Sequence, residues 1–304
     1  LADDTARAAA GEIWDGLPRD ARPVIDGLAL PAFRARSGAL AERGAIGLIH
    51  HPTALETGQP EQDRAFLRDA ERLLMPRLTR VIVTSEPTRT CLAADFGVAG
   101  ERISVVVPGT DDLPRCIGSG GPACQILSVG TLVPRKGHDV LLRALSSLLD
   151  LDWQLTVVGS PERDCGHARM LSALAGALGI ASRVKFAGEI DDAALEALWQ
   201  GSDLFALATH WEGYGMAVAE ALKRGLPVAV TAGGATASLV PAGAGTLSPP
   251  GDPAPLSAAL RRVISRPALR RQMAEAAFEA GKALPSWPAQ AQAFAGALAA
   301  SQAP

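Results

Sequence analysis

The sequence has few cysteines and no long uncharged apolar segment. Its four cysteines, among 304 residues, are too few and too scattered for a disulfide framework or a zinc site. Cys116 and Cys124 flank one glycine-rich stretch and could pair, but reduced thiols are the interpretation we favour. No uncharged apolar run reaches the ~18 residues that span a membrane, and no signal peptide is recognisable. We therefore expect a cytoplasmic protein.

The sequence also lacks a strong excess of either charge. The formal net charge is −3, and nucleic-acid binding needs a concentrated basic face, so we expect no nucleic-acid partner. Segment 61–80 carries five arginines among leucines, together with four acidic residues. This composition predicts a solvated amphipathic helix, and peripheral attachment at the inner face of a membrane is the alternative.

A glycine-rich G-x-G-x-x-G after a first strand is missing as well, which argues against a nicotinamide-dependent dehydrogenase. The sequence opens at Leu1 with "LADDTARAAAGEIW", and this stretch predicts a helix. An α/β domain normally begins with a strand, so we expect the N-terminal domain to be incomplete here and to lack its first strands.

Short apolar runs alternate with helical patterns along the chain, as is typical of parallel sheets covered by helices. In the first part, the patterns predict strands over 22–30, 45–50, 80–85 and 102–109 and helices over 34–43, 61–75 and 87–96. In the second part, they predict strands over 125–130, 153–159, 183–188, 203–208, 226–231 and 244–249 and helices over 137–149, 167–178, 192–200, 215–224, 253–265, 267–283 and 286–300. The fold class is therefore α/β, with two Rossmann-like, doubly wound domains facing a cleft.

The stretch 111–125 is rich in Gly and Pro and has no periodicity, which favours an interdomain connection. We place the N-terminal domain at 1–112, the linker at 113–124 and the C-terminal domain at 125–285. A last helix within 286–304 could pack back on the N-terminal domain. Ligands of doubly wound sheets bind outside the carboxyl ends of the strands. Asp150 and Asp152 precede a strand, at the wrong edge, so we expect no metal there.

The segment "GTLVPRKGHDVLLRAL", residues 130–145, leaves a predicted strand through Gly130 and Thr131 and enters a helix at Gly137. Arg135 and Lys136 stand side by side before that helix. A helix start offers unpaired N–H groups and a positive dipole end, and two adjacent cations strengthen such an anion site. Arginine and lysine together suit a diphosphate. A solvated loop with two surface cations is an equally weighted alternative for this segment taken alone.

The segment "EGYGMAVAE", residues 212–220, places two carboxylates on either side of a glycine-broken turn. At ~1.5 Å per helical residue, the backbones of Glu212 and Glu220 lie roughly 12 Å apart or slightly less. A carboxylate only accepts hydrogen bonds and a vicinal diol offers two donors, so this spacing suits a nucleoside diphosphate sugar. Gly213 and Gly215 let the backbone approach a ligand closely. The alternative for Glu220, an ordinary exposed helix residue, fits poorly with its apolar neighbours.

Residues 212–220 resemble the E-x7-E motif of retaining GT-B glycosyltransferases of glycosyltransferase family 4, the glycosyl transferases group 1. "SVGTLVPRKGHDVLLRAL" resembles the phosphate-binding segment of that family, and "RISVVVPGTD" resembles its interdomain boundary. "RVKFAGEIDDAALEALWQGSDLFALAT" also matches the family's pattern. The resemblance covers nearly all of 45–300 and is strongest over 125–250.

The resemblance implies metal-independent transfer of a sugar from a nucleoside diphosphate sugar, with retention of configuration. Arg135 and Lys136 would hold the diphosphate, Glu212 the hydroxyls of the transferred sugar, and Glu220 the ribose. His50, in "LIHHPT", would lie near the sugar, and His51 could take its place. The other donor-binding candidates that the resemblance implies are Gly130, Thr131, Gly188, Glu189, Ile190, Gly213, Tyr214, Gly215, Met216 and Ala217.

No cofactor is expected beyond the donor substrate, for which a UDP-sugar is favoured over a GDP-sugar. The acceptor is open: a small molecule, a glycan or a lipid. Two alternatives use the same donor pocket, namely a GT-B sugar-nucleotide hydrolase or epimerase and a non-catalytic module that binds nucleotide sugars.

Overall fold

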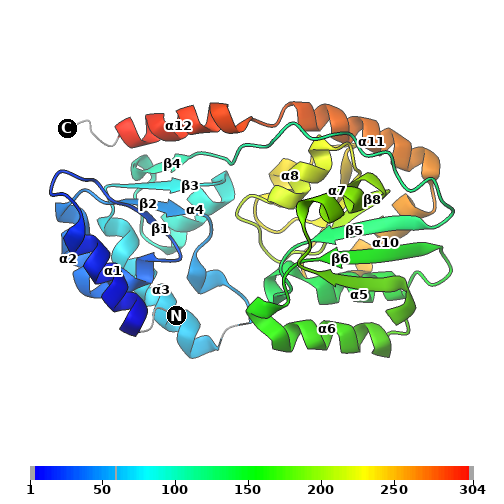
Figure 1. Cartoon of the computed structure of the whole chain (residues 1–304), viewed down its shortest axis with the longest axis horizontal. Coiled ribbons are helices and arrows are strands. Elements are labelled where there is room, and N and C mark those ends of the chain that lie inside the picture. Colours follow the sequence, from blue (N-terminus) through cyan, green and yellow to red (C-terminus); the bar gives the residue numbers. More distant parts are fainter. Residues whose placement is uncertain (1–3, 59, 301–304) are drawn as a thin grey trace. The chain divides into compact units, whose positions relative to one another are not determined.

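The computed structural model describes residues 4–58 and 60–300, which divide into two compact units (Figure 1). The first unit comprises Leu1–Pro108 together with Trp287–Pro304, and the second is Gly109–Ser286. The last helix, α12 (Trp287–Ala299), therefore belongs to the first unit. There, a guanidinium nitrogen of Arg80 donates to the carbonyl of Ala300 at 3.4 Å.

The first unit is built on a parallel sheet with the strand order β1-β2-β3-β4. Its strands are β1 (Val24–Asp26), β2 (Ile46–Ile49), β3 (Arg80–Val83) and β4 (Ile103–Val105). The helices before and between them are α1 (Asp4–Gly16), α2 (Ser37–Glu42), α3 (Glu61–Leu74) and α4 (Glu86–Asp95). Buried side chains from both the sheet and the helices form one core, among them Leu74, Val81, Val83 and Leu92.

The expectation of a strand over 22–30 is wrong beyond its first half. β1 ends at Asp26, and the chain turns there because the Asp26 carboxylate accepts the N–H of Leu28 at 2.8 Å and the Asp26 carbonyl accepts the N–H of Ala29. A 3₁₀ helix over Leu30–Arg36 follows, with Pro31 in its first turn. An aspartate that bonds to its own backbone two residues on is a common turn device.

The second unit holds a six-stranded parallel sheet in the order β10-β9-β8-β5-β6-β7. In chain order the strands are β5 (Cys124–Val129), β6 (Trp153–Val158), β7 (Val184–Gly188), β8 (Leu204–Leu207), β9 (Val228–Thr231) and β10 (Gly245–Ser248). Counted from β5, this is the doubly wound order of Rossmann folds, and the direction of winding reverses between β5 and β8. The expected α/β fold class is confirmed.

The helices of the second unit are those that the sequence predicts, plus one short helix. They are α5 (His138–Ser146), α6 (Cys165–Ala177), α7 (Asp192–Gln200), α8 (Met216–Lys223), α9 (Thr236–Leu239), α10 (Pro253–Ile264) and α11 (Pro267–Lys282). The additional helix, α9, has four residues and is too short to produce an amphipathic period in a sequence.

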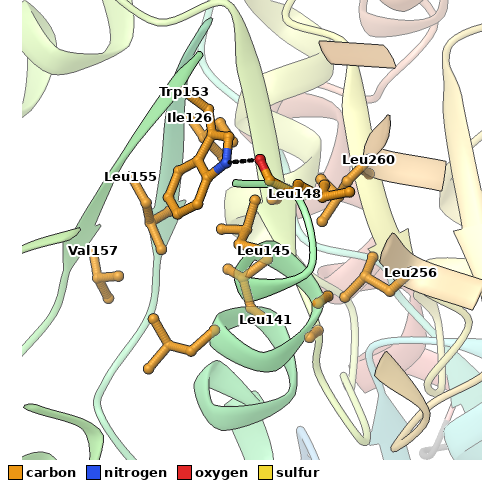
Figure 2. Close-up of a cluster of buried hydrophobic side chains, with 14 of the residues drawn as sticks. Ile126, Leu141, Leu145, Leu148, Trp153, Leu155, Val157, Leu256 and Leu260 are labelled. Atoms are coloured by element: carbon orange, nitrogen blue, oxygen red, sulfur yellow. Dashed lines mark hydrogen bonds between the residues drawn. The ribbon is translucent and has the colours of Figure 1, made fainter. Parts of the chain in front are cut away.

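The core beneath α5 shows how the spacing of apolar residues along helices and strands specifies their packing (Figure 2). Leu141 and Leu145 lie four residues apart on one face of α5, Leu148 lies in the turn after the helix, and all three are buried. They meet β6, where alternate residues, beginning with Trp153, point to the same side. The indole N–H of Trp153 donates to the Leu148 carbonyl at 2.9 Å, so the polar atom of this buried ring has a partner.

Residues 113–124, expected as a linker, lie in the second unit and bond to it. The N–H of Cys116 donates to the Arg224 carbonyl at 2.9 Å, and the Ser119 hydroxyl donates to Asp203 at 2.6 Å. All four cysteines are free thiols. Burial raises the pKa of Cys116 to about 11 and that of Cys124 to about 12. Among the described residues, no helix is both long and apolar enough to cross a bilayer.

The α5 core gives a stability prediction. Leu145→Ala removes a fully buried side chain and leaves a cavity between α5 and the sheet, so unfolding should become easier by ~2–5 kcal/mol. Urea unfolding followed by circular dichroism measures the change. Leu149→Ala is the matched control, because Leu149 is 50% exposed, and its effect should stay within ~0.5 kcal/mol. Equal losses in the two variants would contradict this account of the core.

Candidate functional site

The two loops that leave β5 and β8 meet at the reversal point of the second sheet, where open α/β sheets bind ligands. The carbonyl of Arg135, in the first loop, accepts the N–H of His210 at 2.8 Å and the hydroxyl of Thr209 at 3.1 Å, both from the second loop. In return, the Arg135 guanidinium donates to the carbonyl of Trp211 at 2.8 Å. The loops are therefore fixed to each other by backbone carbonyls that accept hydrogen bonds from one backbone and two side-chain donors.

Gly137 allows this close approach. Its φ of +64° is left-handed, and a Cβ atom there would lie 2.0 Å from the Ala208 carbonyl oxygen. Any side chain would push the first loop away from the end of β8. The glycine caps both the 3₁₀ turn Pro134–Lys136, which carries Arg135 and Lys136, and the start of α5.

Three of the predicted residues come together between these loops. The Lys136 ammonium lies 2.7 Å from a carboxylate oxygen of Glu212, and the Arg135 guanidinium lies 3.6 Å from the same oxygen. All three side chains are at least four-fifths buried, with exposed fractions of 16% for Lys136, 18% for Arg135 and 9% for Glu212. Two cations face one carboxylate, so the group carries a formal charge of +1. Partial burial makes this charge act more strongly than it would in water.

The backbone of Glu212 is fixed as firmly as its side chain. Its N–H donates to the carbonyl of Gly233 at 3.1 Å, and its carbonyl accepts the N–H of Ala235 at 2.9 Å. Both partners lie in the loop that follows β9, the next strand of the sheet. The segment after β9 therefore holds the backbone of Glu212 in place, a role that the sequence did not indicate.

The start of α8 adds backbone donors beside this group. Gly215 caps the helix with a φ of +100°, and its carbonyl accepts the N–H groups of Val218 and Ala219 at 3.0 Å. The amides of Met216 and Ala217 come before the first of these bonds, at the end of the helix where the dipole favours an anion. Gly213 and Tyr214 form the turn into the helix, and burial raises the pKa of Tyr214.

Glu220 lies further along α8 and lines a separate pocket of about 340 Å³. Met216, from the first turn of α8, and Asp192, from the start of α7, line the same pocket. Burial raises the pKa of Glu220 above its ordinary value; the charge of Arg224 opposes this shift, and Asp111 adds to it. One helix thus connects the charged group around Glu212 with the pocket of Glu220.

The remaining donor-binding candidates lie at the carboxyl ends of β5 and β7, the two strands on either side of β6. Gly130 and Thr131 directly follow β5, and the N–H of Gly130 donates to the Val158 carbonyl at 2.8 Å. Gly188 ends β7, and its carbonyl accepts the N–H of Gly159 at 2.9 Å. After it, Glu189 is exposed and Ile190 is half-buried against the apolar cluster under α8.

His50 belongs to the first unit. It follows β2, and its Nε2 lies 3.3 Å from a carboxylate oxygen of Asp26, the last residue of the adjacent strand β1. Sequence reasoning missed Asp26, although an acidic residue at a strand end was a usable signal. His51 is more buried, with a side chain 13% exposed against 58% for His50, and its Nε2 lies 3.5 Å from Glu56. Of the two histidines, His50 is the accessible one.

His138 is a second residue that sequence reasoning missed. It is the first residue of α5, is fully buried, and places its Nε2 3.3 Å from the Gly130 carbonyl oxygen. Burial lowers the pKa of His138 to about 4, and the nearby charge of Lys136 adds to the effect, against the hydrogen bond to Gly130. The imidazole is therefore neutral at pH 7 and fixes the residue at which the first loop leaves β5.

This burial predicts a pH-dependent stability. As the pH falls, the unfolded chain protonates His138 near the ordinary 6.5 and the folded protein only near 4. Stability present above pH 6.5 is therefore lost as the pH falls towards 4. Between pH 7 and pH 5, the native protein should lose ~2 kcal/mol more than His138→Gln, which keeps a donor without a titrating ring. Urea unfolding at both pH values checks this, and identical pH dependence of the two proteins would contradict it.

Comparison with known proteins places the chain in a family. Residues 118–280 match the sequence model of the family described as glycosyl transferases group 1. The chain belongs to this family. The match spans α7, α8 and both loops of the site, so Arg135, Lys136, Glu212 and Glu220 all lie within it.

Among curated relatives, the chain is 30% identical over 251 residues to D-inositol 3-phosphate glycosyltransferase of Geodermatophilus obscurus, covering 74% of this chain and 56% of the relative. It is 26% identical over 227 residues to mannosylfructose-phosphate synthase of Agrobacterium fabrum, covering 63% of this chain and 50% of the relative. The chain thus spans about half the length of the curated relatives it matches.

Solved structures show the same fold. A structure of HepE of Anabaena with UDP and glucose superposes with a TM-score of 0.78 at 21% identity and covers 98% of this chain and 83% of that one. Sucrose-phosphate synthase of Thermosynechococcus elongatus gives 0.73 at 22% identity and covers 90% and 79% of the two chains. The GT-B fold expected from the sequence is thereby confirmed.

In the part of the chain that the structure describes, no group of three or more His, Cys, Asp or Glu side chains is arranged to hold a metal ion.

Proposed function

We propose that this group 1 glycosyltransferase moves a sugar from a UDP-sugar to an acceptor hydroxyl with retention of configuration and without a metal ion. The observation that carries the proposal is the buried group of Arg135, Lys136 and Glu212 at the reversal point of the second sheet. It places two cations and one carboxylate where the fold exposes backbone donors.

Each charge has a task in this reaction. As the bond to the sugar breaks, negative charge grows on the leaving diphosphate, and Arg135 and Lys136 stabilise that charge from fixed positions. The amides at the start of α8 add to the same field. Because these groups supply the positive charge, a metal ion is not required. Glu212 accepts hydrogen bonds from the hydroxyls of the sugar, with Lys136 holding its carboxylate in place.

The nucleoside extends along α8. The Glu220 carboxylate accepts hydrogen bonds from the ribose hydroxyls in its pocket, and the backbone of Gly188, Glu189 and Ile190 contacts the base. In a retaining mechanism, the acceptor attacks on the face from which the diphosphate leaves, and the diphosphate takes the acceptor proton. UDP is favoured as the nucleotide because HepE of Anabaena was solved with UDP, with UDP and glucose, and with UDP-glucose.

For the acceptor, the relatives favour a phosphorylated polyol or sugar. One group of relatives is named for D-inositol 3-phosphate, and another relative for mannosylfructose phosphate. The test is incubation of the full chain with UDP-, GDP- and ADP-sugars, with and without inositol phosphates and sugar phosphates, followed by mass spectrometry. Transfer from a UDP-sugar is the expected result. Donor hydrolysis without transfer would favour the hydrolase or epimerase alternative, and binding alone would favour the non-catalytic module.

The phosphate site has its own test. The double variant Arg135→Ala, Lys136→Ala removes two charged donors from the diphosphate, so the Kd for UDP should rise on the order of 100-fold by isothermal titration calorimetry. The control, Lys185→Ala with Arg262→Ala, removes the same charge from exposed positions of the second unit and should leave the Kd within about twofold at 0.15 M salt, where exposed charges are screened. Unchanged UDP affinity in the first variant would reject the site.

A further inference from the structure

The pocket of Glu220 is rich in acidic groups. Its lining includes the carboxylates of Asp111, Asp192, Glu196 and Glu220, and one basic side chain, Arg224, faces them. Four carboxylates against one guanidinium give a formal charge of −3, which disfavours ionisation of the most buried acid in the pocket. The position and partners of Arg224 therefore decide what Glu220 can do.

Arg224 is held rigidly in this pocket. Its side chain is 6% exposed, and two of its guanidinium nitrogens lie 2.9 and 2.6 Å from the two carboxylate oxygens of Glu196 on α7. The guanidinium also stacks over the ring of Trp199, 5.3 Å from its centre. Such a two-pronged pair on an aromatic face fixes the charge in one place. Gln200 donates to the same carboxylate at 2.9 Å and supports the pair.

Glu220 and Arg224 are neighbours on one helical turn. The N–H of Arg224 donates to the Glu220 carbonyl at 3.0 Å, and side chains four residues apart lie on the same face of a helix. Among the residues that the structure describes, the Glu220 carboxylate has neither a hydrogen-bond nor an ion-pair partner, so it is free to accept from a ligand. Burial raises the pKa of Glu220, with a further contribution from the charge of Asp111, and the positive charge of Arg224 opposes this rise.

We propose that Arg224 is a positioning residue: fixed by Glu196 and Trp199, it keeps the unpaired Glu220 carboxylate ionised at the pocket, ready to accept both hydroxyls of a vicinal diol. This inference rests on the proposed function for the identity of the diol, a ribose. The effect of Arg224 on the ionisation of Glu220 is a property of the protein without any ligand. Arg224 acts through Glu220 and does not itself contact the ligand. The pocket thus recognises the ribose through the ionised Glu220 carboxylate, and residues of α7 hold the arginine that keeps this carboxylate ionised.

The first test needs no ligand. The ¹³C carboxyl signal of Glu220, assigned with Glu220→Gln, is titrated by NMR in the full chain and in Arg224→Met, which keeps the length of the side chain over Trp199. The titration midpoint should move to higher pH by about one unit, a tenfold change in the protonation equilibrium. In Glu196→Gln, the guanidinium loses its counter-charge, and the midpoint should move to lower pH. Since the two variants must shift in opposite directions, a general loss of structure cannot produce the result, and an unchanged midpoint in either overturns the proposal.

The second test uses UDP and 2′,3′-dideoxy-UDP, which differ in the diol alone. Arg224→Met should weaken UDP severalfold at pH 5.5, at most by the tenfold that a one-unit shift allows, and little at pH 8, and it should leave dideoxy-UDP unchanged at both. Equal weakening of both nucleotides, or the same weakening at both pH values, overturns the role of Arg224. Failure of the native protein to bind UDP would sink the proposed function instead, and the NMR titration would still decide the inference.

Discussion

The carbonyl oxygen of Arg135 is the point on which the site depends. It accepts the amide of His210 and the hydroxyl of Thr209, and so joins the loop after β5 to the loop after β8. Those strands are neighbours in the sheet but far apart in the chain, since the first is followed by two further strands before the second begins. With the loops joined, Lys136 and Glu212 meet at 2.7 Å although 76 residues separate them.

Burial sets the character of the charges that result. Lys136 and Glu212 satisfy each other in a place that water barely reaches, and the second cation, Arg135, leaves the group positive. The pocket of Glu220 has the opposite sign. One helix, α8, thus passes from a positive region at its start to a negative region one turn later. In the proposed complex, the diphosphate of a UDP-sugar lies in the positive region and the ribose hydroxyls lie in the negative one.

Much of this was predictable from the sequence because it depends on local patterns. The alternation along β6 and the four-residue spacing of leucines in α5 encode the burial of those elements, and the glycines at 137 and 215 encode the turns between them. The charged members of the site are close in sequence to those glycines.

What escaped prediction depends on packing between distant segments. His138 looks like any polar residue at a helix start, and the pair of Arg224 and Glu196 exists because α7 lies beside α8. The strand predicted over 22–30 is too long because the carboxylate and the carbonyl of one residue, Asp26, turn the chain at the end of β1.

The second unit is one continuous segment, whereas the first unit contains residues from both sides of it, among them α12. Residues 1–108 therefore leave the ribosome long before their last helix does, and the whole second unit is synthesised in between. The second unit is continuous in sequence and can fold as soon as it has been synthesised, whereas the first unit acquires α12 only after that. The packing of α12 on the first unit therefore joins segments that are synthesised far apart in time.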